Sequence, residues 1–199
     1  MSDPGRHVSD RWAAWRRDVD LGEYHVRFRR MEEEGRSSHG EADLIESLQP
    51  SSVLDAGCGM GRVAIELARR GVHVEGIDLD ADLLAFAQAD APHLRWHHGD
   101  LATVDVGRTF DVVAMPGNVM IFCRADDRST IVANMARHVE PGGLLVAGFS
   151  LDRRHDALTI DEYDRHCEQA GLQLLDRFAT WDRAPYIGGD YAVSLHVVR

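Results

Sequence analysis

Three glycines at alternate positions follow a short apolar run and precede a helical pattern. The segment reads Val53-Leu54-Asp55-Ala56-Gly57-Cys58-Gly59-Met60-Gly61-Arg62. Glycine permits the tight turn that joins a buried strand to a helix, and a turn without side chains lets a ligand approach the backbone. The unpaired N–H groups at the start of the helix face the crevice at the carboxyl ends of the strands. The segment therefore predicts a ligand-binding loop.

Two details separate this loop from a nicotinamide-nucleotide site. The dinucleotide fingerprint is G-x-G-x-x-G, whereas the third glycine here, Gly61, comes one residue early. Asp55 lies two residues before the first glycine. A carboxylate there would repel a pyrophosphate and attract an amine or a sulfonium. We therefore expect a cationic ligand that carries no phosphate.

Two more carboxylates follow the next two predicted strands. Asp78 ends the apolar run 72–77, and a carboxylate at the tip of a second strand can accept both hydroxyls of a ribose. Asp100 follows the third strand, where it can accept the amine of an adenine while Leu79 and Leu101 face the base. Together with the carboxylate of the glycine loop, these groups match an amino acid, a ribose and an adenine in order.

The elements that must position these groups alternate between buried strands and helices, with right-handed crossovers. This alternation predicts a parallel sheet covered on both faces, and the direct link between the last two strands predicts an antiparallel partner at one edge. Asp80 is expected to cap a helix, and Arg16-Arg17 to lie on a solvated helix face. The stretch 1–50, helical over 24–34, stands outside the alternation. Strands are predicted at 53–56, 72–77, 94–97, 110–114, 144–148, 172–180 and 191–198, and helices at 42–48, 61–70, 80–89, 126–138 and 161–170, with the turn Pro141-Gly142-Gly143 before the fifth strand.

These motifs resemble those of the class I S-adenosylmethionine-dependent methyltransferases. The resemblance runs from about Glu41 to Arg199 and is strongest at 53–62, 74–78 and 99–101. It implies an α/β fold with a Rossmann-like, doubly wound, seven-stranded sheet whose last strand is antiparallel. We expect an N-terminal helical cap over residues 1–40 and the S-adenosylmethionine-binding methyltransferase domain over residues 41–199.

The resemblance also implies the cofactor, S-adenosylmethionine, and the product, S-adenosylhomocysteine. The glycines of the loop would line the methionine part, Asp78 would hold the ribose, and Asp100 with Leu101 would frame the adenine. The segment after the fourth strand, 115–118, would flank the sulfonium. The predicted cofactor-binding residues are Asp55, Ala56, Gly57, Cys58, Gly59, Gly61, Arg62, Asp78, Leu79, Gly99, Asp100, Leu101, Met115, Pro116, Gly117 and Asn118.

Composition narrows the methyl acceptor. The chain has 33 acidic and 22 basic residues, all of the basic ones Arg, for a net charge of −11. Such a surface repels a phosphate backbone, which disfavours nucleic acid as a partner. The family motif for amino groups of bases, an Asn or Asp followed by two prolines and an aromatic residue, is replaced by Met-Pro-Gly-Asn-Val-Met at 115–120. We therefore expect a small, partly apolar acceptor.

Methyl transfer from a sulfonium is an in-line displacement, so the protein mainly aligns acceptor and methyl, and a base is needed only for a protonated acceptor. Candidate catalytic residues are His25, Asn118, His155 and Tyr186. Imidazole titrates near neutrality, although an ordinary surface role is the alternative for either histidine. The pair His97-His98 lacks a further ligand at a metal-binding spacing, so no metal is expected.

Three alternatives and the cellular setting complete the expectations. The competing functions are a non-methylating enzyme on the same scaffold, an S-adenosylmethionine-binding module without turnover, and a nicotinamide oxidoreductase.

The first residues lack a basic-then-apolar signal, and no apolar run reaches the ~20 residues of a membrane span. The three Cys are odd in number and far apart, as in a reducing compartment. We expect a cytoplasmic monomer or homodimer.

Overall fold

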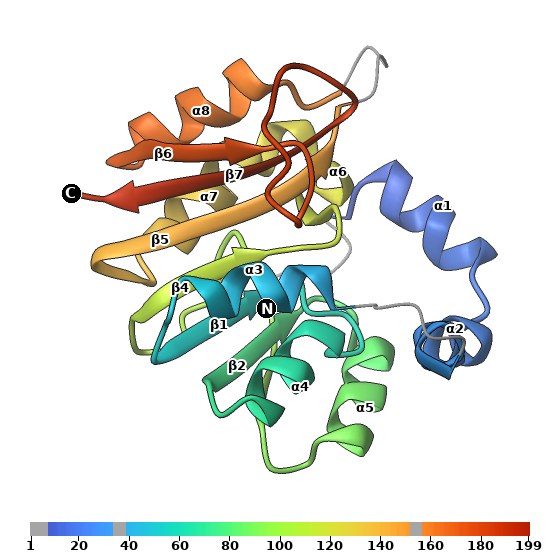
Figure 1. Ribbon diagram of the computed structural model, residues 1–199. Helices are drawn as coiled ribbons and strands as arrows, with labels where there is room; N and C mark the ends of the chain where they lie inside the picture. The colour runs from blue at the N-terminus through green and yellow to red at the C-terminus, as the bar shows by residue number, and fades with distance from the viewer. Residues whose placement is uncertain (1–7, 34–38, 152–156) are drawn as a thin grey trace.

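The apolar runs of the chain form one seven-stranded sheet in a computed structural model, which describes residues 8–33, 39–151 and 157–199 (Figure 1). The strand order is β3-β2-β1-β4-β5-β7-β6. Strands β1 to β5 run parallel to one another, and β7 is antiparallel to both of its neighbours. The doubly wound sheet with an antiparallel last strand is thereby confirmed. The strands are β1 (Ser52–Ala56), β2 (His73–Asp78), β3 (Arg95–His98), β4 (Phe110–Met115), β5 (Val139–Ser150), β6 (Leu172–Phe178) and β7 (Tyr191–Val198).

The antiparallel strand does not lie at the edge of the sheet. β7 enters between β5 and β6, so β6 is the edge strand. The residues 192–196 of β7 are buried in an unbroken run, whereas 173–176 of β6 are exposed, with Leu175 60% exposed. A strand buried on both faces belongs inside a sheet. The unbroken burial of β7, in contrast to the exposed face of β6, therefore agrees with its place inside the sheet.

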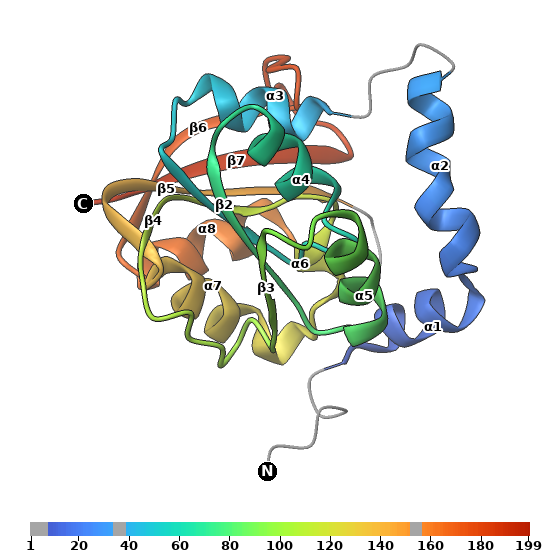
Figure 2. The same cartoon turned by 90° about the horizontal axis from the view of Figure 1, so that it is seen from below.

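Helices cover both faces of the sheet (Figures 1 and 2). Alternate side chains of each strand point to opposite faces, so Val53 packs with helices α3 and α4, while its neighbour Leu54 packs with α7 and α8. These two apolar clusters hold the central strands in place from both faces. The carboxyl ends of these strands carry the site. The helices are α3 (Gly40–Ser47), α4 (Arg62–Arg69), α5 (Ala81–Asp90), α6 (Val119–Phe122), α7 (Arg128–Ala136) and α8 (Ile160–Gln169), with a 3₁₀ turn at Ala125–Asp127.

The prediction of a turn at Pro141-Gly142-Gly143 is wrong, because these residues lie inside strand β5. Phe110 of β4 pairs with Val139, and Val112 pairs with Leu144, so the register shifts across this segment. Gly142 has a φ of +80°, and a side chain on Gly143 would come within 2.7 Å of a backbone oxygen of β4. The glycines thus form a β-bulge that bends the strand without ending it.

Two N-terminal helices stand outside the alternation, where the sequence predicted one. They are α1 (Asp10–Asp18) and α2 (Leu21–Glu33). The hydroxyl of Ser9 caps α1 by accepting the Trp12 N–H at 3.1 Å. Both helices lie beside the sheet and its covering helices, next to α5 (Figure 2). No helix in the described part of the chain is long and apolar enough to span a membrane.

Candidate functional site

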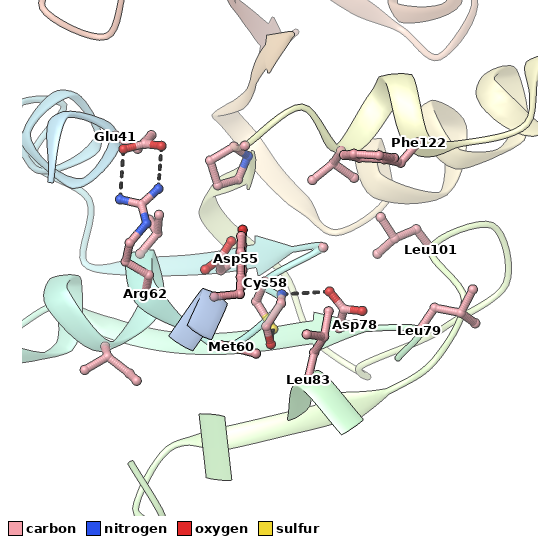
Figure 3. Close-up of a pocket in the computed structure, with 18 of the residues that line it drawn as sticks. Glu41, Asp55, Cys58, Met60, Arg62, Asp78, Leu79, Leu83, Leu101 and Phe122 are labelled. Atoms are coloured by element: carbon pink, nitrogen blue, oxygen red, sulfur yellow. Dashed lines mark hydrogen bonds and ion pairs between the residues drawn. The ribbon is translucent and has the colours of Figure 1, made fainter. Parts of the chain in front are cut away.

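A cavity of about 560 Å³ lies where the parallel strands end. Asp55 in β1, Asp78 at the end of β2 and Asp100 after β3 all line it, and Pro116 and Gly117 line it from the loop after β4. Figure 3 shows these walls around Asp55 and Asp78. The three carboxylates that the sequence places on successive strand tips therefore share one hollow. Helices α1 and α2 contribute its outer wall, through Trp12 and Trp15 of α1 and Tyr24 and His25 of α2.

Asp55 is a buried carboxylate with one unused oxygen. Its side chain is 1% exposed, and Oδ2 accepts the Ala64 N–H at 3.1 Å. Oδ1 is buried and accepts no hydrogen bond from any residue the structure describes. Burial raises the pKa of Asp55 to about 7, helped by the charge of Asp78 and opposed by Arg62. A buried acceptor of this kind is suited to a cationic donor from a ligand.

Asp78 fixes the glycine loop to the tip of β2. Its Oδ2 accepts the Gly59 N–H at 2.7 Å, and its Oδ1 accepts the Asp80 N–H at 2.9 Å. Burial raises the pKa of this carboxyl above its usual value, while these backbone donors act in the opposite direction. A carboxylate has about four lone-pair sites, so the backbone donors leave room for a hydroxyl donor from a ligand.

The cavity has an apolar end beyond Asp78. Leu79 and Leu101 lie there together with Phe122 of α6 (Figure 3). Asp100 stands beside them, with Oδ1 accepting the Ala102 N–H at 2.8 Å. An apolar slot with a carboxylate at its rim suits a flat ring that carries a hydrogen-bond donor.

The opposite end of the cavity carries charge (Figure 3). The Arg62 guanidinium donates from Nη1 to Glu41 Oε2 at 3.0 Å and from Nη2 to Oε1 at 2.5 Å. This two-bond geometry holds the guanidinium of the first α4 residue beside Asp55 and the glycine loop. The long axis of the cavity therefore runs from a charged end at Arg62 to an apolar end at Leu101.

The three loop glycines serve different purposes. A Cβ on Gly59 would meet nothing within 4 Å, so the loop is open to the cavity there. A Cβ on Gly57 would lie 2.6 Å from Val119, and one on Gly61 would lie 2.5 Å from the Trp96 ring. All three have positive φ, of 81°, 56° and 81° in order. A side chain on Gly57 or Gly61 would thus clash with the protein itself, whereas one on Gly59 would meet open space, and both Gly57 and Gly59 line the cavity.

Most of the predicted cofactor residues line the cavity, and five do not. Met115 is fully buried in the apolar core. The Asn118 side-chain oxygen accepts the Ser150 N–H at 2.7 Å and the Ser150 hydroxyl at 3.1 Å, which ties the β4 loop to β5. The residues that line the cavity are Asp55, Gly57, Cys58, Gly59, Arg62, Asp78, Leu79, Asp100, Leu101, Pro116 and Gly117, and those outside its lining are Ala56, Gly61, Gly99, Met115 and Asn118.

Of the predicted catalytic residues, His25 lines the cavity. Its Nε2 lies 2.6 Å from Asp90 Oδ2, and its ring lies 4.8 Å from that of Phe86. Tyr186 is half-buried in the loop between β6 and β7, outside the cavity lining. His155 falls outside the described residues. The structure therefore brings one of the four candidates to the hollow.

Two tryptophans of α1, which the sequence did not single out as candidates, form an aromatic wall of the cavity. Trp12 and Trp15 line the cavity, with ring centroids 4.8 Å apart and 5.5 and 6.1 Å from that of Phe122. Tyr24 of α2 meets Trp15 edge-on at 5.4 Å, and burial raises the pKa of its hydroxyl. The i, i+3 spacing of the two tryptophans was the available signal, since such residues share one face of a helix.

The two cysteines that line the cavity and the pair His97-His98 are not candidate reactive centres. Burial raises the pKa of Cys123 to about 12 and that of Cys58 well above its usual value, so both thiols stay protonated. His97 Nε2 lies 2.7 Å from the buried Glu75, and His98 Nε2 lies 2.9 Å from the Leu79 carbonyl oxygen. Within the described ranges, no cluster of three His, Cys, Asp or Glu residues suits a metal ion.

Comparison with known proteins places this geometry in context. A family model described as a methyltransferase domain matches residues 53–143. The crystal structure of a TehB-like SAM-dependent methyltransferase from Corynebacterium glutamicum is 33% identical and superposes with a TM-score of 0.80. That similarity covers 89% of this chain and 97% of the other.

Two curated relatives are similar over shorter segments. A dTDP-3-amino-3,4,6-trideoxy-alpha-D-glucopyranose N,N-dimethyltransferase of Streptomyces venezuelae is 34% identical over 108 residues, 53% of this chain and 46% of that protein. Magnesium-protoporphyrin O-methyltransferase of Rhodobacter capsulatus is 32% identical over 141 residues, 66% of this chain and 62% of that protein. The chain thus spans about half the length of these relatives.

Proposed function

The chain belongs to the class I S-adenosylmethionine-dependent methyltransferases, and we propose that it transfers a methyl group from S-adenosylmethionine to a small-molecule acceptor. The observation that carries the proposal is the unused Oδ1 of Asp55, buried in the cavity beside two further carboxylates. A cationic amino-acid group supplies the donor that this oxygen lacks. A pyrophosphate would bring negative charge to the same place, which is why a nicotinamide nucleotide fits poorly.

The rest of the cavity fits the remaining parts of this cofactor. We assign the ribose to Asp78, whose carboxylate keeps lone pairs for hydroxyl donors. We assign the adenine to the apolar slot between Leu79 and Leu101, with Asp100 at its rim. Arg62, held by Glu41, is assigned to the carboxylate end of the methionine part. The order of charged and apolar walls along the cavity then matches the order of groups along the molecule.

The residues of the chain mainly position the reactants. The bound cofactor supplies an activated methyl group on a sulfonium. Pro116 and Gly117, after the end of β4, line the cavity, and the aromatic rings of Trp12 and Trp15 line it from α1, where they would limit the access of water. Holding two reactants in line in such a site is a large part of what catalysis of a displacement requires.

A proton acceptor is needed only for an acceptor that is protonated at the working pH. Among the described candidates, we assign this role to His25, which lines the cavity. The Asp90 carboxylate, 2.6 Å from Nε2, fixes the orientation of the ring and leaves Nδ1 as the atom that takes the proton. Asn118, whose side-chain oxygen is bonded to Ser150, is assigned a structural role.

The acceptor class is proposed from the relatives together with the cavity. Their printed names describe methylation of an aminodeoxy-sugar nucleotide and of magnesium protoporphyrin, both small molecules. We propose a small molecule for this chain as well, and its net charge of −11 supports the exclusion of nucleic acid. We further infer a cytoplasmic location, which three cysteines that form no disulfide support, and a monomer or homodimer.

The test is methyl transfer itself. The full chain is incubated with methyl-labelled S-adenosylmethionine and a panel of amines, phenols and hydroxylated small molecules, and labelled product and S-adenosylhomocysteine are measured by mass spectrometry. The proposal predicts stoichiometric label transfer to at least one acceptor, slowed by Asp78→Ala when the S-adenosylmethionine concentration is below saturation. Binding of the cofactor without label transfer to any acceptor would indicate a binding module, and a transferred aminopropyl group would indicate a different chemistry.

A further inference from the structure

We propose that Arg16 is a positioning residue for the bound cofactor, because it clasps Asp80 and Asp82 at the start of α5 and so holds α1 closed across the adenosyl end of the cavity. The inference rests on the proposed function, since it takes the adenosyl group to lie beside Asp78. It corrects the expectation that Arg16 lies on a solvated helix face.

The clasp is a single guanidinium between two carboxylates. Arg16 donates from Nε to Asp80 Oδ2 at 2.7 Å and from Nη2 to Asp82 Oδ2 at 2.5 Å. The Asp80 side chain is 11% exposed, and that of Arg16 is 30% exposed. Two ion pairs made by one planar guanidinium fix its position and orientation more closely than a single surface pair does.

The other end of α1 is attached to α6. Val8 forms a β-bridge with Cys123, and the Ser9 hydroxyl donates to the carbonyl oxygen of Phe122. The Trp12 ring then packs edge-on against the Phe122 ring at 5.5 Å. Since α6 follows β4 and α5 follows β2, α1 bridges the carboxyl ends of two strands that flank the cavity.

Between its two attachments, α1 presents Trp12 and Trp15 to the cavity. No side chain of α1 is fully buried, so few apolar contacts hold the helix in place. A segment of this kind opens at a low free-energy cost, and its closed population depends strongly on its directional contacts. Such opening is also what entry and release of a cofactor behind the helix require.

The clasp is coupled to the ribose subsite through Asp80. The Asp80 N–H donates to Asp78 Oδ1 at 2.9 Å, while Asp80 Oδ1 caps α5 by accepting the Asp82 and Leu83 N–H groups. Three carboxylates thus stand at alternate positions 78, 80 and 82, and the charge of Asp80 acts on Asp78. The Arg16 cation neutralises part of this repulsion and ties the helix to the loop that carries Asp78.

The experiment measures release of S-adenosylhomocysteine by stopped-flow tryptophan fluorescence, using the full chain. Trp12 and Trp15 line the cavity and serve as reporters. We expect Arg16→Ala to dissociate about tenfold faster than the wild type, with Arg16→Lys in between. Arg17→Ala is the matched control, since it removes the same charge from a 72% exposed side chain of the same helix, and it should stay within about twofold of the wild type.

The pairing with Asp82 supplies a second readout. Asp82→Asn should speed release by about threefold, and adding it to Arg16→Ala should have no further effect. Raising the salt concentration should speed release from the wild type and leave Arg16→Ala unchanged. Thermal unfolding of the proteins without ligand checks that the variants are folded. Asp82 is 72% exposed, so Asp82→Asn still tests the clasp if Arg16→Ala does not fold.

The outcomes separate the two proposals. A wild-type chain that binds no S-adenosylhomocysteine would refute the proposed function. A wild-type chain that binds it, while Arg16→Ala and Arg17→Ala release it at the same rate, would overturn the clasp alone. Multiplicative effects of Arg16→Ala and Asp82→Asn would show that the two residues act separately and would also overturn the clasp.

Discussion

Replacing Asp55 by Asn should stabilise the free protein at neutral pH and weaken its binding of the cofactor. Asp55 is 1% exposed, and its Oδ1 has no hydrogen-bond donor among the described residues. Burial raises its pKa from the ordinary value of 3.8 to about 7. The unfolded chain therefore loses this proton at a much lower pH than the folded chain. Asparagine keeps the shape of the side chain and its acceptor for the Ala64 N–H, and it carries no charge.

The sign and size follow from proton linkage. Between the unfolded and folded pKa values, the folded state binds more protons, so this group lowers stability as the pH rises from about 4 to about 7. A shift of about three units corresponds to roughly 4 kcal/mol at a pH above both values, of which about 2–3 kcal/mol accumulates between about pH 5 and about pH 8. The difference between Asp55→Asn and the wild type should grow by that amount over this range.

The assay is urea unfolding of both proteins at a series of pH values, with Asp126→Asn as the control. Asp126 is 90% exposed, so removing its charge should leave the pH dependence of the wild type unchanged. Titration with S-adenosylhomocysteine should show about a ten- to hundredfold loss of affinity in Asp55→Asn, from the loss of a charged hydrogen bond. Equal pH dependence of stability in Asp55→Asn and the wild type would refute the description of Asp55 as a buried carboxylate whose pKa is raised in the free protein.

Three further predictions concern the same site. Asp78→Ala should weaken cofactor binding by ~1–3 kcal/mol in calorimetry through the loss of acceptors for two hydroxyls, and unchanged affinity would remove Asp78 from the site. Binding of S-adenosylhomocysteine near pH 6 should release close to one proton, measured in buffers of different ionisation enthalpy, because a bound ammonium lowers the Asp55 pKa; equal heats in all buffers would argue against that contact. Gly61→Ala should lower the free energy of unfolding by about 2–4 kcal/mol, because its Cβ would lie 2.5 Å from Trp96. Gly71→Ala is the control, since Gly71 has a φ of +90° but open space around it, and this change should lower the free energy of unfolding by about 1 kcal/mol. Equal losses in the two variants would contradict the packing role of Gly61.

The sequence predicted the sheet and the loop because both depend on local pattern. Buried strands such as 53–56 and the cap residue Asp80 leave signatures in neighbouring residues, and Asp80 does accept the Asp82 and Leu83 N–H groups. The bulge at 141–143 was mistaken for a turn because Pro-Gly-Gly favours both, and only pairing with β4 distinguishes them. The position of β7 between β5 and β6 likewise depends on its burial on two faces.

The outer wall of the site could not be predicted in the same way. Arg16 meets Asp80 and Asp82 across more than sixty positions of sequence, and its charge by itself fits a solvated helix equally well. The structural role of Asn118 was unpredictable for the same reason, because its side chain bonds to Ser150, 32 positions away, and joins the loop after β4 to the end of β5. The spacing of the loop glycines predicts a ligand contact for Gly61 as well. In the structure, this position requires glycine because a side chain there would clash with the Trp96 ring. Contacts distant in sequence decide which residues of a motif face the ligand.

A crystal structure of the chain grown with saturating S-adenosylhomocysteine tests the central claim most directly. The account predicts density in the cavity with the ammonium at hydrogen-bond distance from Asp55 Oδ1, the ribose hydroxyls on Asp78 and the adenine between Leu79 and Leu101. Density for the ligand outside this cavity, or a bound ligand with its ammonium turned away from Asp55, would contradict it.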